Sequence, residues 1–225
     1  MYYSPRIVTS GLVLALDAAE RLSYPRTGTT WRDLSGNNNN GTLTNGPTFN
    51  SANGGSIVFD GSDDYVNISN ASILNNGSQT INIWFYYTST PGNGISVMGK
   101  HDTVGSFNGY NMYGYSGVNF ACEFKNASAY AAGIGFTLTA NTWWCITMKF
   151  TINGTLSVYR NASKISSLSL GSITMTTQPL RIGRSVDTYW SALPGRVASV
   201  QIYSRELSDD EVLQNFNVTR ARFGV

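Results

Sequence analysis

The stretch GRVASVQIYSRELSDDEVLQNF, residues 195–216, decides the fold because it joins a strand to a helix. Its first half alternates between two sets of side chains, which is the period of a strand with one covered face. One set is Ala198, Val200 and Ile202, and the other is Val197, Ser199, Gln201 and Tyr203. A strand of this kind needs a sheet around it, so the stretch predicts a sheet followed by a helix.

The second half carries the signals of a helix start. Ser208 can accept the backbone N–H of Glu211 while the Glu211 side chain reaches back to the N–H of Ser208, which is a capping box. Leu207 can contact Val212 as the accompanying hydrophobic staple. We therefore expect a helix over 208–216. Its apolar stripe consists of Val212, Leu213 and Phe216.

Most other regular segments alternate with a period of two, which predicts strands. These segments are 11–17, 56–60, 65–68, 80–88, 141–150, 156–161 and 180–183, and 109–120 would alternate in the same way if it is extended. Segments 56–60 and 65–68 are expected to form a hairpin around the turn GSDD, and 23–50 to form a long ordered loop. The chain is therefore expected to be all-β apart from its last helix.

The composition bounds the class of protein. Charged residues make up 12% of the 225 residues and 23 residues are glycines, which is typical of short strands joined by turns. The net charge of +2 is too small to indicate a nucleic-acid partner. The two cysteines, Cys122 and Cys145, are expected to be free buried thiols, although the sequence leaves one bridge between them open.

The N-terminal segment 1–20 gives no indication of export. It contains a mildly apolar run that includes Asp17, and it lacks a basic start followed by a clean cleavage site. We therefore expect no signal peptide. No apolar segment is long enough to span a bilayer, so membrane insertion is not expected either.

Four segments, together with the stretch that joins strand and helix, resemble one family in order along the chain. They are LVLALDAAE at 12–20, TTWRDLSGNNNNGTLTNGPTF at 29–49, GGSIVFDGSDDYVNI at 54–68 and LRIGRS at 180–185. The resemblance is to laminin-G-like, pentraxin-type domains of the concanavalin A-like lectin/glucanase superfamily, of the kind found in bacteriophage structural proteins. This fold hosts lectins, hydrolases and purely structural modules, so the resemblance defines function less closely than fold.

The resemblance implies a jelly-roll β-sandwich of two antiparallel sheets with a short C-terminal helix. It places all of 1–225 in one domain, with an N-terminal arm over 1–10, the helix over 208–216 and a tail over 217–225 that lies against the sandwich. It also implies that the first strand, 11–17, pairs beside 196–203.

Catalysis is not expected. Sandwich hydrolases that resemble this fold carry two carboxylates as alternate acidic residues along one strand, and no strand of this chain has that pattern. Its four glutamates are isolated or at the helix start: Glu20, Glu123, Glu206 and Glu211. The acidic residues at 209–211 lie in the first turn of the helix, where the helix dipole favours negative charge. A single histidine, His101, excludes a zinc site made of several histidines.

Calcium is the metal that the resemblance makes a candidate, because loops of laminin-G-like domains often hold it with carboxylate, amide and backbone oxygens. Asp60, Asp63 and Asp64 are the first candidates, and Asp33 with Asn37 could add oxygens from a neighbouring loop. Asx turns explain the same residues without a metal. No cofactor is required by the sequence, and Ca²⁺ is left open.

Two functions from different classes are consistent with these features. The first is a structural, decoration or attachment protein on the surface of a bacteriophage virion, assembled in the host cytoplasm without a signal peptide. Its partners would be other virion proteins of the capsid, tail or fibre and host-surface glycans, and homo-oligomers are left open. The second is a carbohydrate-binding lectin module of a longer or secreted surface protein.

Glycan binding needs aromatic side chains that stack on a sugar beside polar groups. The candidates are Trp84, Tyr86, Tyr113, Tyr115, Tyr189 and Trp190. For most of them, packing inside the sandwich is the alternative that we favour. Tyr189 and Trp190 are the exception, because they lie in a loop between turn residues. If 109–120 is extended, Tyr113 and Tyr115 share a face with Asn111.

Overall fold

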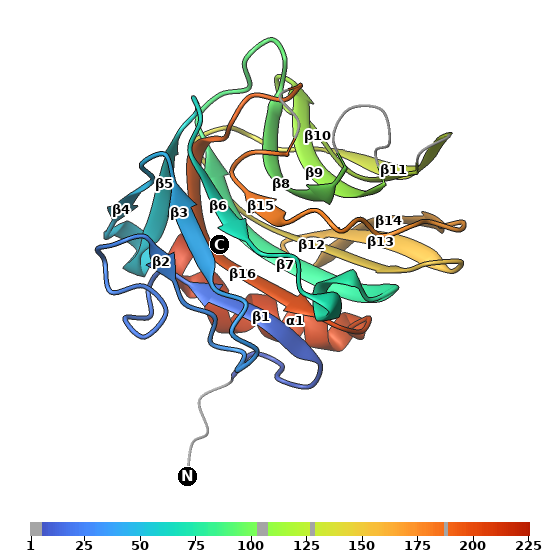
Figure 1. Ribbon diagram of the computed structural model, residues 1–225, viewed down its shortest axis with the longest axis horizontal. Helices are drawn as coiled ribbons and strands as arrows, with labels where there is room; N and C mark the ends of the chain where they lie inside the picture. The colour runs from blue at the N-terminus through green and yellow to red at the C-terminus, as the bar shows by residue number, and fades with distance from the viewer. Residues whose placement is uncertain (1–5, 103–107, 127–128, 187–188) are drawn as a thin grey trace.

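The computed structural model describes residues 6–102, 108–126, 129–186 and 189–225, and its strands form two antiparallel sheets that pack face to face (Figure 1). Sheet A runs β14 (Ser163–Ser169), β13 (Thr155–Arg160), β12 (Trp143–Thr151), β7 (Ser78–Tyr87), β16 (Pro194–Tyr203), β5 (Ser56–Asp60) and β4 (Thr48–Asn50), and β1 (Leu12–Asp17) also pairs with β16. Sheet B runs β11 (Ala129–Thr137), β10 (Asn119–Asn126), β9 (Gly109–Ser116), β8 (Ile95–His101), β15 (Leu180–Ile182), β6 (Tyr65–Ile68), β3 (Gly41–Thr44) and β2 (Thr30–Trp31). The expected sandwich of two antiparallel sheets is confirmed.

Helical elements add little to the sandwich except at its C-terminal end. Helix α1 spans Asp209–Thr219, and the 3-10 turns are η1 (Ala52–Gly54), η2 (Ser72–Asn75) and η3 (Arg220–Phe223). Among the described residues, we find no helix with the length and hydropathy that crossing a bilayer requires.

Strand β16 is the central strand of sheet A. One of its edges pairs with β7, and the other pairs with β5 along 194–197 and with β1 along 199–203. Leu14 lies opposite Ile202, and Leu16 opposite Val200. The predicted pairing of the first strand with this one is therefore confirmed, and it brings the two ends of the chain into one sheet.

A β-bulge interrupts the alternation of β16. Its register against β7 shifts between Val197 and Ser199. The extra residue at this point reverses which alternate side chains point toward the core beyond it. Val197, Val200 and Ile202 therefore pack between the two sheets, whereas Ala198 packs under α1. The predicted grouping of Ala198 with Val200 and Ile202 is wrong because a strict period of two does not anticipate an extra residue.

The turn GSDD does not close a hairpin, contrary to the prediction. Strand β5 before it belongs to sheet A, and β6 after it belongs to sheet B, so 61–64 carries the chain from one sheet to the other. Two alternating strands joined by a short turn look the same in sequence whether they pair in one sheet or belong to two different sheets. Segment 23–50 also differs from the predicted loop, because it contains β2, β3 and β4, which are too short to show alternation.

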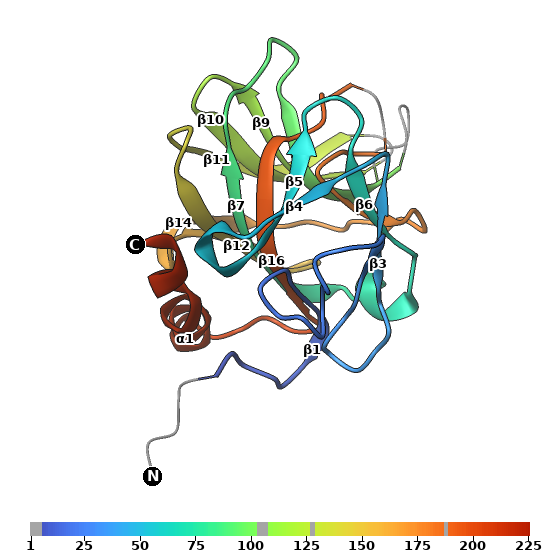
Figure 2. The ribbon, with the colours of Figure 1, turned by 90° about the vertical axis from the view of Figure 1, so that its left-hand side faces the viewer.

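Helix α1 packs against the face of sheet A that points away from sheet B (Figure 2). Its capping box is present as predicted, and Leu207 and Val212 share one apolar cluster. The helix continues to Thr219, three residues beyond the predicted end. Leu213 is 46% exposed, so its place in the predicted stripe is wrong. The buried positions are Val212, Asn215, Phe216 and Thr219, the spacing of one helix face.

Trp84 is the anchor of this packing. Its ring lies 4.1 Å from that of Phe223 and 5.7 Å from that of Phe216, and its indole N–H donates to Thr219 Oγ1 at 2.9 Å. The tail therefore lies against the sandwich, as the resemblance implied. Trp84 is fully buried, which corrects its assignment as a glycan contact.

Both cysteine thiols are free and buried, as expected. Cys122 lies in the main core, and Cys145 lies under α1, where its thiol donates to Asn82 Oδ1. Burial raises the pKa of both thiols, since it disfavours the charged thiolate. The two side chains therefore act as small apolar groups of the core.

Val200→Asp should lower the free energy of unfolding by about 3–5 kcal/mol, because it places an unpaired charge between the sheets. Val200 is fully buried and lies opposite Leu16. Urea denaturation followed by circular dichroism measures the change. Val118→Asp is the control, because Val118 is 50% exposed. Equal midpoints for the two variants would contradict the prediction.

Ser208→Ala should lower the free energy of unfolding by about 1 kcal/mol, because the backbone N–H of Glu211 loses the Oγ acceptor that it contacts at 3.2 Å. Thermal unfolding measures the loss. Ser51→Ala is the matched control, since Ser51 precedes η1 without a capping hydrogen bond from its side chain. The prediction fails if the control is destabilised as much as the capping variant.

Candidate functional site

The outer face of sheet B carries polar and aromatic side chains on three adjacent strands. On β9, Tyr110 and Met112 belong to the core, whereas the chain alternation turns Asn111, Tyr113 and Tyr115 outward as predicted. Glu123 on β10 lies opposite Asn111, and Asn111 lies opposite Gly99 on β8. Asn111 and Glu123 therefore lie side by side on the face that points away from the core, and Gly99 leaves the position beside them without a side chain.

The loop 183–193, between β15 and β16, brings two further aromatic residues to this face. Its ends meet through a hydrogen bond from the N–H of Leu193 to the carbonyl of Gly183 at 2.7 Å. The carbonyl of Ser191 also accepts the N–H of Ser96 at 3.0 Å, which fixes the loop to β8 (Figure 1). Gly94 leaves room for Trp190, because a Cβ there would lie 2.7 Å from the indole ring.

Four of the six predicted aromatic residues meet on this face, and we call them the aromatic cluster: Tyr113, Tyr115, Tyr189 and Trp190. Ring centroids are 4.4 Å apart for Tyr113 and Trp190, 4.8 Å for Tyr189 and Trp190, and 5.9 Å for Tyr113 and Tyr115. Tyr189 is 67% exposed and Tyr115 44% exposed. The cluster therefore offers a partly exposed stacking surface.

Tyr86 does not join the aromatic cluster, because it belongs to sheet A. Its ring packs 5.6 Å from Trp143, its hydroxyl donates to Asn141 Oδ1, and the Arg196 guanidinium lies 4.7 Å from the ring centroid. These contacts give Tyr86 a packing role on sheet A, and its assignment as a glycan contact stays a prediction apart from the aromatic cluster.

A small polar recess lies beside Trp190. It is lined by His101, Gly109, Tyr110, Asn111, Glu123, Lys125 and Trp190. Its volume is about 20 Å³, and a cavity holds a water molecule once this volume reaches about 10–15 Å³. His101, Asn111 and Glu123 are each only 5% exposed. The recess therefore combines little space with buried polar groups.

Glu123 is the charged centre of the polar recess. Its Oε2 accepts the hydroxyl of Tyr113 at 2.8 Å, and its Oε1 lies 3.2 Å from the Lys125 ammonium. Through Tyr113, the carboxylate is connected directly to the aromatic cluster. Asn111 Oδ1 contacts Ser96 Oγ at 3.4 Å, which orients its amide on the neighbouring strand.

The alternation of β9 predicts that Asn111 lies on this face, but no single pattern in the sequence assigns His101, Glu123 or Lys125 to it. Two features of the sequence could have located Glu123 on this face: Asn111 and Tyr113 share one face of their strand, and a turn sets β10 beside β9. Pairing then brings Glu123 to the side of Asn111.

The arrangement suits non-covalent binding. Hydrolysis of a glycosidic bond by paired carboxylates needs two such groups about 5–10 Å apart. Glu123 is the one carboxylate among the described residues that line the polar recess.

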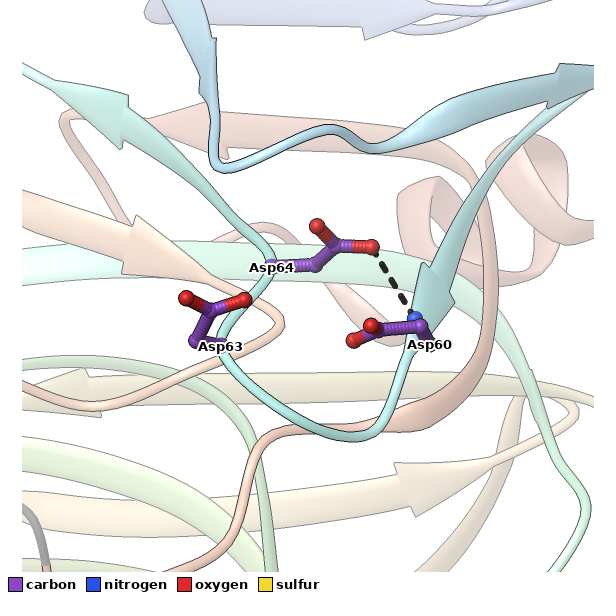
Figure 3. Close-up of side chains that lie close together, drawn as sticks. All are labelled: Asp60, Asp63 and Asp64. Atoms are coloured by element: carbon purple, nitrogen blue, oxygen red, sulfur yellow. Dashed lines mark hydrogen bonds between the residues drawn. The ribbon is translucent and has the colours of Figure 1, made fainter.

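Asp60, Asp63 and Asp64 come together in the turn between β5 and β6 (Figure 3). One carboxylate oxygen of each lies within 4.8 Å of the others. Asp64 is buried and its Oδ2 accepts the N–H of Asp60 at 3.0 Å. Burial, followed by repulsion from Asp60 and Asp63, raises the pKa of Asp64 although the Asp60 N–H opposes this shift. Three hard oxygen ligands fit the chemistry of Ca²⁺.

Asp33 and Asn37 do not belong to this group of carboxylates. Asp33 Oδ1 accepts the N–H groups of Ala15 and Ser35, and Oδ2 accepts the N–H of Asn39. The Asn37 amide donates to Ser35 Oγ at 3.0 Å. These bonds hold the loop against β1, so the structure gives both residues a local structural role.

Solved structures with the same fold include binding domains of bacterial toxins. The binding domain of Paraclostridial Mosquitocidal Protein 1 has a TM-score of 0.72 and 19% identity, over 92% of this chain and 52% of that one. The botulinum neurotoxin serotype D binding domain has a TM-score of 0.72 and 14% identity, over 93% and 52%. The binding domain of botulinum neurotoxin DC in complex with SialylT has a TM-score of 0.70 and 15% identity, over 93% and 52%.

At these identities the likeness concerns the fold, and the chain spans about half the length of the toxin domains. No curated protein has a sequence that matches this one significantly. A family model does match: the one described as the concanavalin A-like lectin/glucanases superfamily covers residues 60–213, which is more than half of the chain. This protein therefore belongs to the concanavalin A-like lectin/glucanase superfamily, as a laminin-G-like member.

Proposed function

We propose that this protein is a non-enzymatic glycan-binding module whose contact surface is the aromatic cluster with the adjoining polar recess. The observation that carries the proposal is the placement of the exposed Tyr189, beside Trp190, next to a buried carboxylate. A sugar ring has apolar C–H faces that stack on aromatic rings, and hydroxyl groups that need fixed polar partners. This face of sheet B offers both.

The likeness to toxin binding domains agrees with this proposal without carrying it. One of those domains is described in complex with SialylT. This chain corresponds to about half of that domain, so the position of the glycan there assigns no residue here. The argument for glycan binding rests on the described side chains of this chain.

A location on a bacteriophage virion remains a prediction from the sequence. A shallow surface of four aromatic residues suits weak single contacts, which many copies on one particle would convert into strong attachment. Finding that purified particles of the source lack the chain would contradict this location. Glycan binding by the isolated chain does not depend on it.

Tyr189→Ala and Trp190→Ala should each weaken binding to a glycan by about threefold to tenfold, because each removes a stacking surface worth about 0.5–1.5 kcal/mol. A glycan array presented with multivalent protein measures the change. Leu22→Ala is the control, because Leu22 is 76% exposed and apolar. The proposal is wrong if no glycan binds, or if the aromatic variants and the control bind equally.

We further propose that Asp60, Asp63 and Asp64 bind Ca²⁺. Millimolar Ca²⁺ should then raise the melting temperature, because a cation relieves the repulsion among the three carboxylates. Asp64→Asn should abolish this rise and should stabilise the metal-free protein slightly, since the amide oxygen can still accept the Asp60 N–H. Glu20→Gln, at an exposed carboxylate, is the control. Equal melting temperatures in Ca²⁺ and in chelator would exclude the site.

A further inference from the structure

We propose that the polar recess selects the chemical class of the glycan: it takes one hydroxyl or hydroxymethyl group of an uncharged sugar and excludes an acidic sugar such as sialic acid. This inference rests on the proposed glycan-binding function and deepens it. Three properties of the recess carry it: its size, its hydrogen-bonding groups and its charge.

The size of the recess limits what enters. Its volume of about 20 Å³ suits a group as large as a water molecule. A sugar hydroxyl matches that size, and a hydroxymethyl group adds one carbon at the entrance. A carboxylate brings three heavy atoms and a full charge, so it suits the recess less well than a hydroxyl does. The ring of the sugar stays outside, where Trp190 forms the edge of the recess.

The hydrogen-bonding groups favour a hydroxyl. Glu123 accepts one bond from Tyr113 and one contact from Lys125, and a carboxylate has about four acceptor positions in all. A sugar hydroxyl can donate to a remaining position of Glu123 and can accept from the Asn111 amide. An ionised carboxylate has no proton to donate. A carboxylate placed in the recess would therefore leave Glu123 without the partner that a hydroxyl of the same or another sugar supplies.

The paired charges of the recess give no advantage to an anion. Glu123 is 5% exposed, and its carboxylate is screened little by water at this position. Lys125 lies 3.2 Å from Glu123 Oε1, so the pair has no net charge. An anion that approached Lys125 would compete with Glu123 for the ammonium and would meet the Glu123 carboxylate at close range. Because an uncharged sugar meets neither cost, its hydroxyl groups bind preferentially.

The experiment compares neutral and sialylated glycans on one surface. The probes are immobilised oligosaccharides that end in galactose, glucose, mannose or N-acetylglucosamine, with the galactose-ended ones also in sialylated form. The full chain is presented on multivalent beads. We expect binding to at least one neutral class, and we expect its sialylated form to bind at least about tenfold more weakly. Equal or stronger binding to the sialylated form would overturn this inference and leave the proposed function standing. Absence of binding to every probe would overturn both.

Variants connect the selectivity to Glu123. Glu123→Gln should weaken binding of the neutral glycan about tenfold, since hydrogen bonds to charged groups are the stronger ones. It should also reduce the discrimination against the sialylated form. Glu20→Gln makes the same change at an exposed position and should have no effect. Tyr113→Phe keeps the ring but removes the hydroxyl that orients Glu123, and it tests the recess if Glu123→Gln does not fold. Unchanged neutral binding in the folded variants would overturn the inference.

Discussion

The pairing of β16 on both edges is the constraint on which the rest of the structure depends. Strand β7 holds one edge along its length, and β5 and β1 share the other. Its bulge turns Val200 and Ile202 into the space between the sheets and Ala198 toward α1. One strand thus contributes both to the core between the sheets and to the apolar contacts under α1. Because loop 183–193 leads directly into β16, the same pairing fixes the C-terminal end of the loop that carries Trp190.

Two kinds of buried polar group occur near the end of β8, and they have different explanations. Lys100 donates to Asn70 Oδ1 and to the carbonyls of Thr176 and Gln178. These bonds hold the segment that leads to β15, and burial lowers the pKa of Lys100 to about 8. Glu123 holds no distant segment in place, since its contacts are Tyr113 and Lys125 on the same face. Burial of a charge costs free energy unless it is paired, and Glu123 is paired within this face by Lys125 and Tyr113.

Local pattern predicted those features that depend on neighbours in sequence. The capping box at Ser208 and the outward facing of Asn111 and Tyr113 agree with the structure. The pairing of β1 with β16 also agrees, but it was implied by the family resemblance and not by local pattern. Most other features that depend on which strands meet in space were missed. Alternation does not distinguish a hairpin at 61–64 from a turn that leads the chain from one sheet to the other. It also does not show that Glu123 lies beside Asn111 and under loop 183–193. The candidate site consists largely of such long-range contacts.

The two candidate sites share a structural base. Loop 183–193 begins at Gly183, whose φ of +87° and close approach to Phe59 leave no space for a side chain. It ends beside Pro194, which pairs with Asp60 at the start of β16. Both ends of the loop that presents Trp190 therefore lie against the last two residues of β5, immediately before the turn that holds Asp63 and Asp64. The acidic turn and the loop that presents Trp190 are therefore attached to the same end of β5, although neither touches the other's candidate ligand. This common attachment follows from the position of β5 beside β16 in sheet A.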